Sequence, residues 1–456
     1  MSEKHTLSSL LTMYRLLRPL LFRLDPETAH ALTLYVLRFT GAISPLNWAI
    51  SRAFYTPPKP VQAFGLTFRN PVGLAAGYDK DGIAVRGLAA LGFGHIEIGT
   101  VTSRPQAGNP KPRVFRLVED QAVINRMGFP GKGAEFVEQQ LKAYVIARRS
   151  ACASAAGTGE RSVAEPKTDE AISSQQGIVH LHLQQVQVSP PPSTTLPGLA
   201  PPVPASGRLA PAGSRPERGA GRAGRAAARN DMRVMVGQSP TIIVGVNLGK
   251  NKDTPLENAA EDYLSLMRTF APLADYLAIN VSSPNTVGLR RLQGREMLEN
   301  LLKAVAETRN SLALPAPVPQ AQVSKAEGSL VTRPILVKIA PDLSDEELDD
   351  AIGAILDTGM DGVIATNTTL GRQGLRSKHR GETGGLSGSP LTVRSEAVLR
   401  GVVKRVEGRI PVVSVGGIMC PEDAKRRLDM GAALVQVYTG LLYAGPGLVQ
   451  KTIRAV

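Results

Sequence analysis

The chain has 456 residues, and a hydrophobic content of 43% is enough to build a sizeable core, which excludes wholesale disorder. Its 53 basic and 39 acidic side chains give a formal net charge of +14, which suits anionic ligands, anionic lipid or nucleic acid. Only two cysteines exclude a disulfide framework, and no run of about eighteen apolar residues predicts a membrane-spanning helix.

The N-terminal segment, residues 1–55, predicts two short amphipathic helices with arginines among the apolar side chains. The apolar residues expected on one face of the first helix are Leu10, Leu11, Tyr14, Leu17 and Leu21. Pro26, directly after Asp25, is expected to start the second helix. A basic, Leu-rich helix pair fits two arrangements about equally well: a cap on the main domain, or a pair that lies in a membrane interface.

Eight short apolar runs follow, each succeeded by a segment able to form a helix. The runs are residues 72–76, 95–101, 241–248, 276–282, 335–340, 362–368, 411–417 and 434–440. Their nearly continuous Val, Ile and Leu content is typical of parallel strands buried on both faces. Eight strand–helix units predict an α/β fold, a (β/α)8 TIM barrel formed by residues 56–149 and 238–456. An open doubly wound sheet is the alternative, but no G-x-G-x-x-G turn follows the first strand.

Residues 150–237 interrupt this pattern with low-complexity sequence rich in Pro, Ala, Gly and Arg. Nine prolines lie between Pro190 and Pro216, and no apolar period of a strand or helix is present. We expect a disordered, basic insertion on the barrel face opposite the strand C-termini, since it follows a helix and precedes a strand. A nucleic-acid-binding arm is disfavoured because the tract lacks aromatic residues to stack bases. A smaller Pro/Ala/Gln-rich interruption lies at about 314–332.

Polar residues gather at the predicted strand C-termini, where TIM barrels place their active sites. They are Lys80, Thr100, Asn247, Asn280, Lys338, Thr366 and Asn367. Lys338 interrupts an apolar run, where an unpaired charge is costly to bury. Asparagines offer both donors and acceptors, so Asn125, Asn280, Asn285 and Asn367 together suit a planar cyclic amide.

The last two strands end in glycine-containing turns, at the position where such barrels commonly bind phosphate. Gly416-Gly417 follows one strand, and Tyr438-Thr439-Gly440 follows the next. Pro446 is expected to open a terminal helix whose N-terminus favours an anion. Tight turns without a ligand are the plainer interpretation, but two on adjacent strands favour phosphate.

Ten motifs in chain order resemble the dihydroorotate dehydrogenase family, over about residues 10–147 and 238–456. They include NPVGLAAGYDKDG, INRMGFPGKG, INVSSPNTVGLR, VKIAPDLSDEEL and GAALVQVYTG. The N-terminal helices and Ser283 resemble its class 2, the quinone-reducing and membrane-associated form. This resemblance implies FMN-dependent oxidation of (S)-dihydroorotate to orotate in de novo pyrimidine (UMP) biosynthesis, with the electrons passed to a membrane quinone.

The resemblance also implies a role for individual residues. Ser283 matches the base that takes the C5 proton of the substrate while hydride passes from C6 to flavin N5. The resemblance also implies that a water relay near Thr286 and Phe129 assists this proton transfer. Class 1 enzymes use a cysteine as the base, and neither Cys152 nor Cys420 lies in the motif. Positions that match substrate contacts are Lys80, Asn125, Arg126, Met127, Gly128, Phe129, Asn280, Asn285, Asn367 and Thr368. Positions that match flavin contacts are Ala76, Gly77, Lys80, Thr100, Asn247, Asn280, Lys338, Thr366, Gly388, Gly417, Tyr438 and Thr439. The quinone path matches His30, Arg116 and Tyr438, and no metal site is expected.

Two other functions are weighed against this one. A class 1-like enzyme would use fumarate or NAD as the electron acceptor, but Ser283 and the N-terminal helices argue against it. A catalytically silent barrel would act as a membrane or nucleic-acid adaptor, but the lysine, asparagine and serine positions are intact. We therefore expect a monomeric enzyme, bound through its N-terminal helices to the cytoplasmic face of a bacterial cell membrane, without a nucleic-acid partner.

Overall fold

The computed structural model describes residues 14–156, 242–312, 314–315 and 330–456. Most of the predicted insertion at 150–237, and with it the prediction of disorder and of its placement, lies outside these residues, as do Leu10 and Leu11. Within the second interruption, β9 (Leu314–Pro315) pairs with β10 (Leu330–Val331).

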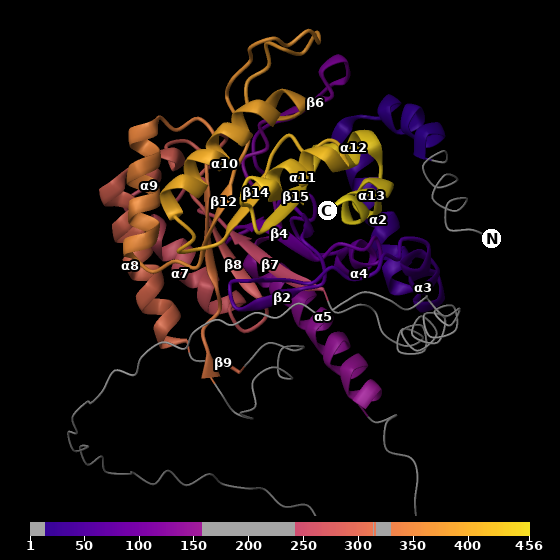
Figure 1. The fold of residues 1–456 in the computed structure, drawn as a ribbon, viewed down its shortest axis with the longest axis horizontal. Helices are drawn as coiled ribbons and strands as arrows, with labels where there is room; N and C mark the ends of the chain where they lie inside the picture. The colour runs from indigo at the N-terminus through magenta and orange to yellow at the C-terminus, as the bar shows by residue number, and fades with distance from the viewer. Residues whose placement is uncertain (1–13, 157–241, 313, 316–329) are drawn as a thin grey trace, which may run out of the picture. The chain divides into compact units, whose positions relative to one another are not determined.

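Eight parallel strands close into a barrel, and each of the eight predicted runs contains one of them (Figure 1). They are β3 (Val72–Leu74), β4 (His95–Val101), β7 (Ile243–Leu248), β8 (Tyr276–Asn280), β11 (Ile335–Ile339), β12 (Gly362–Ala365), β14 (Val412–Val415) and β15 (Leu434–Val437). Each strand pairs with the next, and β15 pairs back with β3, where Val435 lies opposite Val72. All residues of these strands are buried. The predicted (β/α)8 barrel is confirmed.

Helices connect the strands and cover the outside of the barrel (Figure 1). They are α4 (Val85–Ala89), α5 (Gly133–Ala156), α7 (Ala259–Phe270), α8 (Arg295–Ser311), α9 (Asp345–Asp357), α10 (Thr392–Val406), α11 (Pro421–Asp429), α12 (Thr439–Ala444) and α13 (Gly447–Ala455). The start of α9 is fixed by a capping box, in which Ser344 Oγ accepts the Glu347 N–H and the Glu347 carboxylate accepts the Ser344 N–H. Its buried Leu348, Ile352 and Ile355 recur at helical spacing and face the core.

A hairpin closes the N-terminal end of the barrel. It consists of β1 (Val61–Ala63) and β2 (Leu66–Phe68), whose Leu66 and Phe68 are almost fully buried. They pack with inward-facing side chains near the strand starts, such as Tyr276 and Leu434. The barrel interior is therefore filled at this end, and a cavity has room only near the strand C-termini.

A three-stranded antiparallel sheet, which the sequence analysis did not predict, lies at the other end. Its strands are β5 (Val114–Leu117), β6 (Ala122–Asn125) and β13 (Gly385–Gly388), with β6 in the centre. They belong to the connections after β4 and β12, which leave the barrel at its C-terminal end. The sheet brings Asn125 next to Gly385, although the two are far apart in the sequence.

The N-terminal segment forms three helices rather than the two predicted: residues 14–23, α2 (Pro26–Ala42) and α3 (Ser44–Ala53). Asp25 caps α2 by accepting the N–H groups of Glu27 and Thr28, both at 3.0 Å, so the predicted start at Pro26 is confirmed. The α2 helix crosses α4 closely at Gly87, where a Cβ would lie 2.0 Å from the Leu37 carbonyl oxygen.

The face predicted for the first helix is only partly correct. Tyr14 and Leu21 are partly buried, and Tyr14 donates to the Leu442 carbonyl, whereas Leu17 is 48% exposed. The helix is also fixed by Arg18, which donates to the Tyr443 carbonyl at 3.0 Å. None of the helices in the described ranges is long and apolar enough to span a membrane.

Candidate active site

A cavity of about 730 Å³ opens at the C-terminal ends of the barrel strands. Its lining comes from the ends of barrel strands and the residues that follow them, from β5, β6 and β13 with their neighbouring loops, and from α2. The predicted site residues that line it are His30, Ala76, Gly77, Lys80, Thr100, Arg116, Asn125, Met127, Gly128, Phe129, Asn280, Ser283, Asn285, Lys338, Thr366, Asn367, Thr368, Gly388, Gly417, Tyr438 and Thr439. One cavity thus unites positions predicted for substrate, flavin and quinone.

Two predicted site residues do not line the cavity. Asn247 is fully buried below it, where its Oδ1 accepts from Thr100 Oγ1 at 2.6 Å and from Asn280 Nδ2 at 3.1 Å. Arg126 points away and pairs with Glu382 at 2.7 Å. Asn247 therefore orients two lining residues, and the Arg126 side chain is used in an ion pair outside the cavity.

A buried carboxylate lies at the centre of the polar network beneath the cavity floor. Glu97 has no exposed surface and accepts from Asn247 at 2.9 Å, Gln436 at 2.8 Å and Tyr276 at 3.2 Å. Lys338 Nζ lies 3.4 Å from the same carboxylate, and its side chain is 6% exposed. Because unpaired buried charges are costly, Glu97 fixes the lysine ammonium at the floor. Glu97 was not among the residues predicted from the sequence, although, like Lys338, it is a charged residue inside an apolar strand.

The glycine-containing turns form a cradle in which backbone comes close to the cavity. Gly417 has φ +71°, and a Cβ there would lie 2.4 Å from Thr392 Cα; Gly388 has φ +95°, and a Cβ would lie 2.3 Å from the Gln121 carbonyl oxygen. Behind the cradle, the fully buried Arg427 donates to the Gly416 carbonyl at 3.0 Å and to the Thr392 carbonyl at 3.1 Å. Arg427 does not line the cavity and pairs with Glu396 at 3.4 Å, so it supports the turns from behind. The backbone of these turns is what suits a phosphate group.

The helix at this cradle differs from the predicted one. Pro446 opens α13, as predicted, but Pro446 does not line the cavity. The lining helix is α12, which begins at Thr439 directly after β15. The sequence analysis selected α13 because proline is a recognisable helix start, whereas the short α12 has no such signal.

The four asparagines predicted to bracket a cyclic amide meet in two pairs. Asn285 Nδ2 lies 3.3 Å from Asn125 Oδ1, and Asn367 Nδ2 lies 3.3 Å from Asn280 Oδ1. Ser283, 5% exposed, lines the cavity beside them, and its Oγ accepts the Asn285 N–H at 3.2 Å. This leaves the Ser283 hydroxyl proton free to point into the cavity.

Lys80 provides a cation in the cavity that also holds Ser283 and the asparagine pairs. Its Nζ donates to Met127 Sδ at 3.0 Å, and no carboxylate among the described residues forms an ion pair with it. Burial, reinforced by the nearby Arg113, lowers the pKa of Lys80 to about 8. The ammonium is still mostly protonated at neutral pH, and a bound anion would relieve its desolvation.

A second branch of the cavity reaches the N-terminal helices. His30 on α2 lies with its ring 5.0 Å from that of Tyr78, which in turn lies 5.6 Å from that of Tyr438. Burial lowers the pKa of His30 to about 4, so the imidazole is neutral at pH 7. Arg116 lines this branch and donates to the Leu24 carbonyl at 2.8 Å.

The sequence analysis missed an ion pair that joins this branch to the barrel. Arg113 is 8% exposed and donates to both carboxylate oxygens of Glu27 on α2, with its Nε 3.1 Å from Oε1 and 3.2 Å from Oε2. Such a bidentate, mostly buried pair holds the helix in a defined orientation. Glu27 lies one helical turn before His30, a residue predicted to line the quinone path. This spacing on one helix face was the feature of the sequence that could have indicated Glu27.

The chain is similar to known proteins over most of its length. The dihydroorotate dehydrogenase family profile matches residues 60–190 and 216–456. A relative from Roseiflexus sp. (strain RS-1), called dihydroorotate dehydrogenase (quinone), is 40% identical over 442 residues, which cover 96% of this chain and 92% of the relative. A relative from Acidithiobacillus ferrooxidans with the same name is 42% identical and covers 97% of this chain and 93% of the relative.

Solved structures agree with the sequence comparison. Ligand-free DHODH from Eimeria tenella matches with a TM-score of 0.65 and 32% identity, over 94% of this chain and 93% of that chain. The same enzyme in complex with ferulenol matches with a TM-score of 0.64 and 31% identity, over 94% and 90%. By its barrel, its site geometry and these matches, the chain belongs to the dihydroorotate dehydrogenase family.

Proposed function

We propose that this protein is a quinone-dependent dihydroorotate dehydrogenase, which oxidises (S)-dihydroorotate to orotate in UMP biosynthesis and passes the electrons to a membrane quinone. The observation that supports this most strongly is the single cavity, which joins an asparagine-lined pocket beside Ser283 to a branch ending at the N-terminal helices. The quinone-dependent name of the relatives favours this function over fumarate or NAD as acceptor. Intact Lys, Asn and Ser positions argue against a silent adaptor.

FMN fits the donor set of the cavity. Gly388, Gly417 and the first turn of α12 would hold the phosphate, with the buried Arg427 behind them. Thr100, Asn280, Lys338 and Thr366 would hold the ring system, since they line the floor over the Glu97 network. When bound, FMN would supply N5 as the acceptor of the hydride that leaves C6 of dihydroorotate. The cavity volume also lies within the range of cofactor sites.

The substrate side of the reaction follows from the asparagine pairs and Ser283. Asn125, Asn285 and Asn367 would orient the cyclic amide, and the Lys80 ammonium suits its carboxylate. Ser283 Oγ would accept the C5 proton. Because serine is a weak base, its own hydroxyl proton must leave at the same time, through a water relay near Thr286 and Phe129.

The quinone would enter through the branch lined by His30, Arg116 and Tyr438. Of the sixteen large hydrophobic side chains exposed in the described part of the chain, eleven lie between Leu16 and Trp48. An apolar surface at the cavity branch fits a membrane interface, from which a hydrophobic quinone could reach the site. We propose peripheral attachment to the cytoplasmic face of a bacterial membrane, with the protein as a monomer.

The function is tested by acceptor specificity in the purified full chain. We expect a yellow protein with bound FMN that oxidises dihydroorotate with a soluble quinone analogue and does so poorly with fumarate or NAD. Turnover with fumarate but not with quinone would reject the proposed class. A flavin-free protein with no dihydroorotate oxidation would favour the adaptor.

Ser283→Ala tests the base separately. Loss of a general base should slow flavin reduction by dihydroorotate by roughly 10²–10⁴-fold in a single turnover, while FMN stays bound because Ser283 lies outside the phosphate cradle. Ser283→Cys, which keeps a proton acceptor at the position, is the matched control and should retain more activity. Near-normal reduction in Ser283→Ala would refute the role given to Ser283.

A further inference from the structure

We infer that Arg290 and Asp342 form a positioning pair, which holds the Ser283 loop in register with the loop that bears Asn367 and Thr368. The inference rests on the proposed function, because it concerns the placement of the proposed base relative to the proposed substrate-binding residues. Neither Arg290 nor Asp342 lines the cavity. Both therefore act through other residues.

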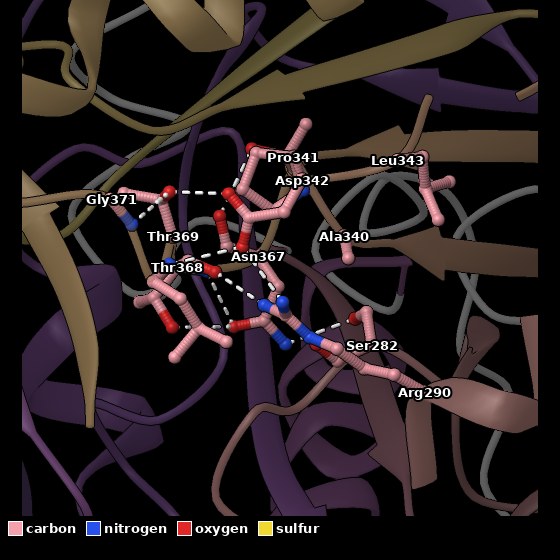
Figure 2. Close-up of polar contacts among 12 residues, drawn as sticks. Ser282, Arg290, Ala340, Pro341, Asp342, Leu343, Asn367, Thr368, Thr369 and Gly371 are labelled. Atoms are coloured by element: carbon pink, nitrogen blue, oxygen red, sulfur yellow. Dashed lines mark hydrogen bonds and ion pairs between the residues drawn. The ribbon is translucent and has the colours of Figure 1, made fainter. Parts of the chain in front are cut away.

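Arg290 connects three loops at the barrel mouth (Figure 2). It lies in the 3-10 helix Leu289–Gln293, and its Nε donates to the Ser282 carbonyl, directly before Ser283, at 3.1 Å. One terminal nitrogen donates to the Thr368 carbonyl after β12 at 2.9 Å. The other donates to the Asp342 carboxylate after β11 at 2.7 Å. A planar guanidinium fixes the directions of all three bonds, so the three loops share one geometry.

Asp342 anchors this arrangement from the other side. Besides Arg290, it accepts the Thr369 hydroxyl (Figure 2). It also accepts the Leu370 N–H at 3.0 Å. The side chains of Arg290 and Asp342 are 22% and 26% exposed, so this pair is better shielded than a fully solvated surface pair. The loop after β12 is therefore attached to the pair by a main-chain carbonyl, a main-chain N–H and a hydroxyl.

A separate hydrogen bond holds the C-terminal end of the 3-10 helix independently of Arg290. Gln293, 2% exposed, accepts the Ala340 N–H at 2.8 Å and thereby fixes the far end of the 3-10 helix to the loop after β11. Residues 283–288 have no comparable anchor to that loop among the described residues except through Arg290. Removal of the guanidinium should thus release the Ser283 end of the segment and leave the Gln293 end in place.

The expected consequence is a slower proton transfer rather than a lost ligand site. A displacement of about 1 Å between catalytic group and substrate can cost roughly 10²-fold in rate. The bond from Asn367 Nδ2 to Ser282 Oγ, at 3.0 Å, does not involve Arg290 and should remain, so we expect a small displacement of Ser283 rather than a separation of the two loops. FMN binding should persist, because Arg290 does not contact Gly388, Gly417 or α12.

The test compares Arg290→Ala with Arg291→Ala in the full-length, FMN-loaded protein. Arg291 is the adjacent exposed arginine, so it controls for loss of charge and helix propensity. We expect Arg290→Ala to slow single-turnover flavin reduction by about 100-fold, with a much smaller change in orotate affinity, and Arg291→Ala to match the parent. Amide hydrogen exchange at residues 283–289 should be faster in Arg290→Ala alone, and this readout does not depend on activity.

Two further variants separate positioning from simple ion pairing. Arg290→Lys keeps a positive charge for Asp342 but lacks the guanidinium nitrogens that reach the Ser282 and Thr368 carbonyls. Flavin reduction should therefore stay slow in this variant. Recovery of the rate would overturn the role given to the guanidinium group. Thr369→Val removes one hydroxyl contact to Asp342, together with the acceptor of the Gly371 N–H, but keeps Arg290. It should give a smaller loss in the same direction, which preserves the test if Arg290→Ala does not fold. Equal rates and equal exchange in the Arg290 and Arg291 variants would overturn the inference. If the parent does not oxidise dihydroorotate, the proposed function fails, while the exchange comparison still decides whether Arg290 holds the loop.

Discussion

Polar side chains buried inside the barrel determine which ligands the cavity suits. Glu97, Lys338 and Gln436 point into the interior from three different strands, and their contacts fix a positive charge at the cavity floor. Removal of either Glu97 or Lys338 would leave the other charge buried and unpaired. Loss of one partner should therefore lower the free energy of unfolding by about 3–5 kcal/mol. The same residues are thus required for folding and for the chemistry proposed at the floor.

The buried His95 makes the stability of the folded protein depend on pH. Its side chain has no exposed surface, and burial lowers its pKa to about 4, partly opposed by Glu97. The unfolded chain takes up a proton below about pH 6.5, whereas the folded chain does not until about pH 4. The stability that His95 contributes is therefore fully present above pH 6.5 and is lost as the pH falls towards 4.

We predict that His95→Gln reduces this loss. Between pH 7 and pH 4, the free energy of unfolding of the variant should rise relative to that of the parent by about 2–3 kcal/mol, as measured by urea unfolding at each pH. The comparison must be between variant and parent, because burial raises the pKa of Asp79 to about 6 and acts with the opposite sign in an overlapping range. Parallel pH curves for the two proteins would contradict the prediction.

At the scale of elements, the N-terminal helices pack on the barrel through apolar side chains such as Leu34 and through polar contacts, and they leave other apolar side chains exposed. The α2 helix is held by the Arg113–Glu27 pair and by its close crossing at Gly87. Its exposed Leu32, Tyr35, Val36 and Phe39 recur at the spacing of one helical face. An outward apolar stripe is unusual for a soluble helix and favours a membrane partner.

We predict that Leu16→Asp combined with Phe39→Asp weakens binding to anionic lipid vesicles at least roughly tenfold, because two apolar side chains no longer enter the interface. Turnover with a water-soluble quinone analogue should be preserved, since the two side chains are 70% and 63% exposed and do not line the cavity. Val393→Asp is the matched control: Val393 is 79% exposed but lies on α10. Equal vesicle binding by the parent, the double variant and Val393→Asp in a sedimentation assay would show that the N-terminal helices are not the surface that binds the membrane.

At the scale of the whole molecule, the cavity-lining residues that the structure describes all belong to residues 26–132 or 280–442. In the described part of the chain, β7 begins at Ile243, at the barrel end opposite the cavity. The eight barrel strands and the described residues of the cavity thus all lie outside residues 150–237.

We predict that deleting residues 152–234 leaves FMN binding and dihydroorotate turnover nearly unchanged, because the cavity-lining residues in the described part of the chain all lie outside the deletion. A longer deletion from residue 141 is the matched control; it also removes Leu141, a fully buried residue of α5, and should prevent folding. Steady-state kinetics and flavin content report both outcomes. A large loss of kcat in a folded, flavin-loaded 152–234 deletion would show that the tract acts on the site.

The sequence by itself determined the barrel and most of the residues that line its cavity. Eight apolar runs separated by helical segments have few ways to bury both faces, and polar residues at their ends must then meet at one mouth. What only the tertiary structure decided depends on contacts between distant segments: Asn247 lies beneath the floor, α12 rather than α13 lines the cradle, and a third N-terminal helix packs beside α2. Glu97 and Arg290 had a recognisable residue type, but their roles follow from partners more than 50 residues away. Local patterns determine which elements form, whereas the direction of a side chain and its partners are set when the barrel closes.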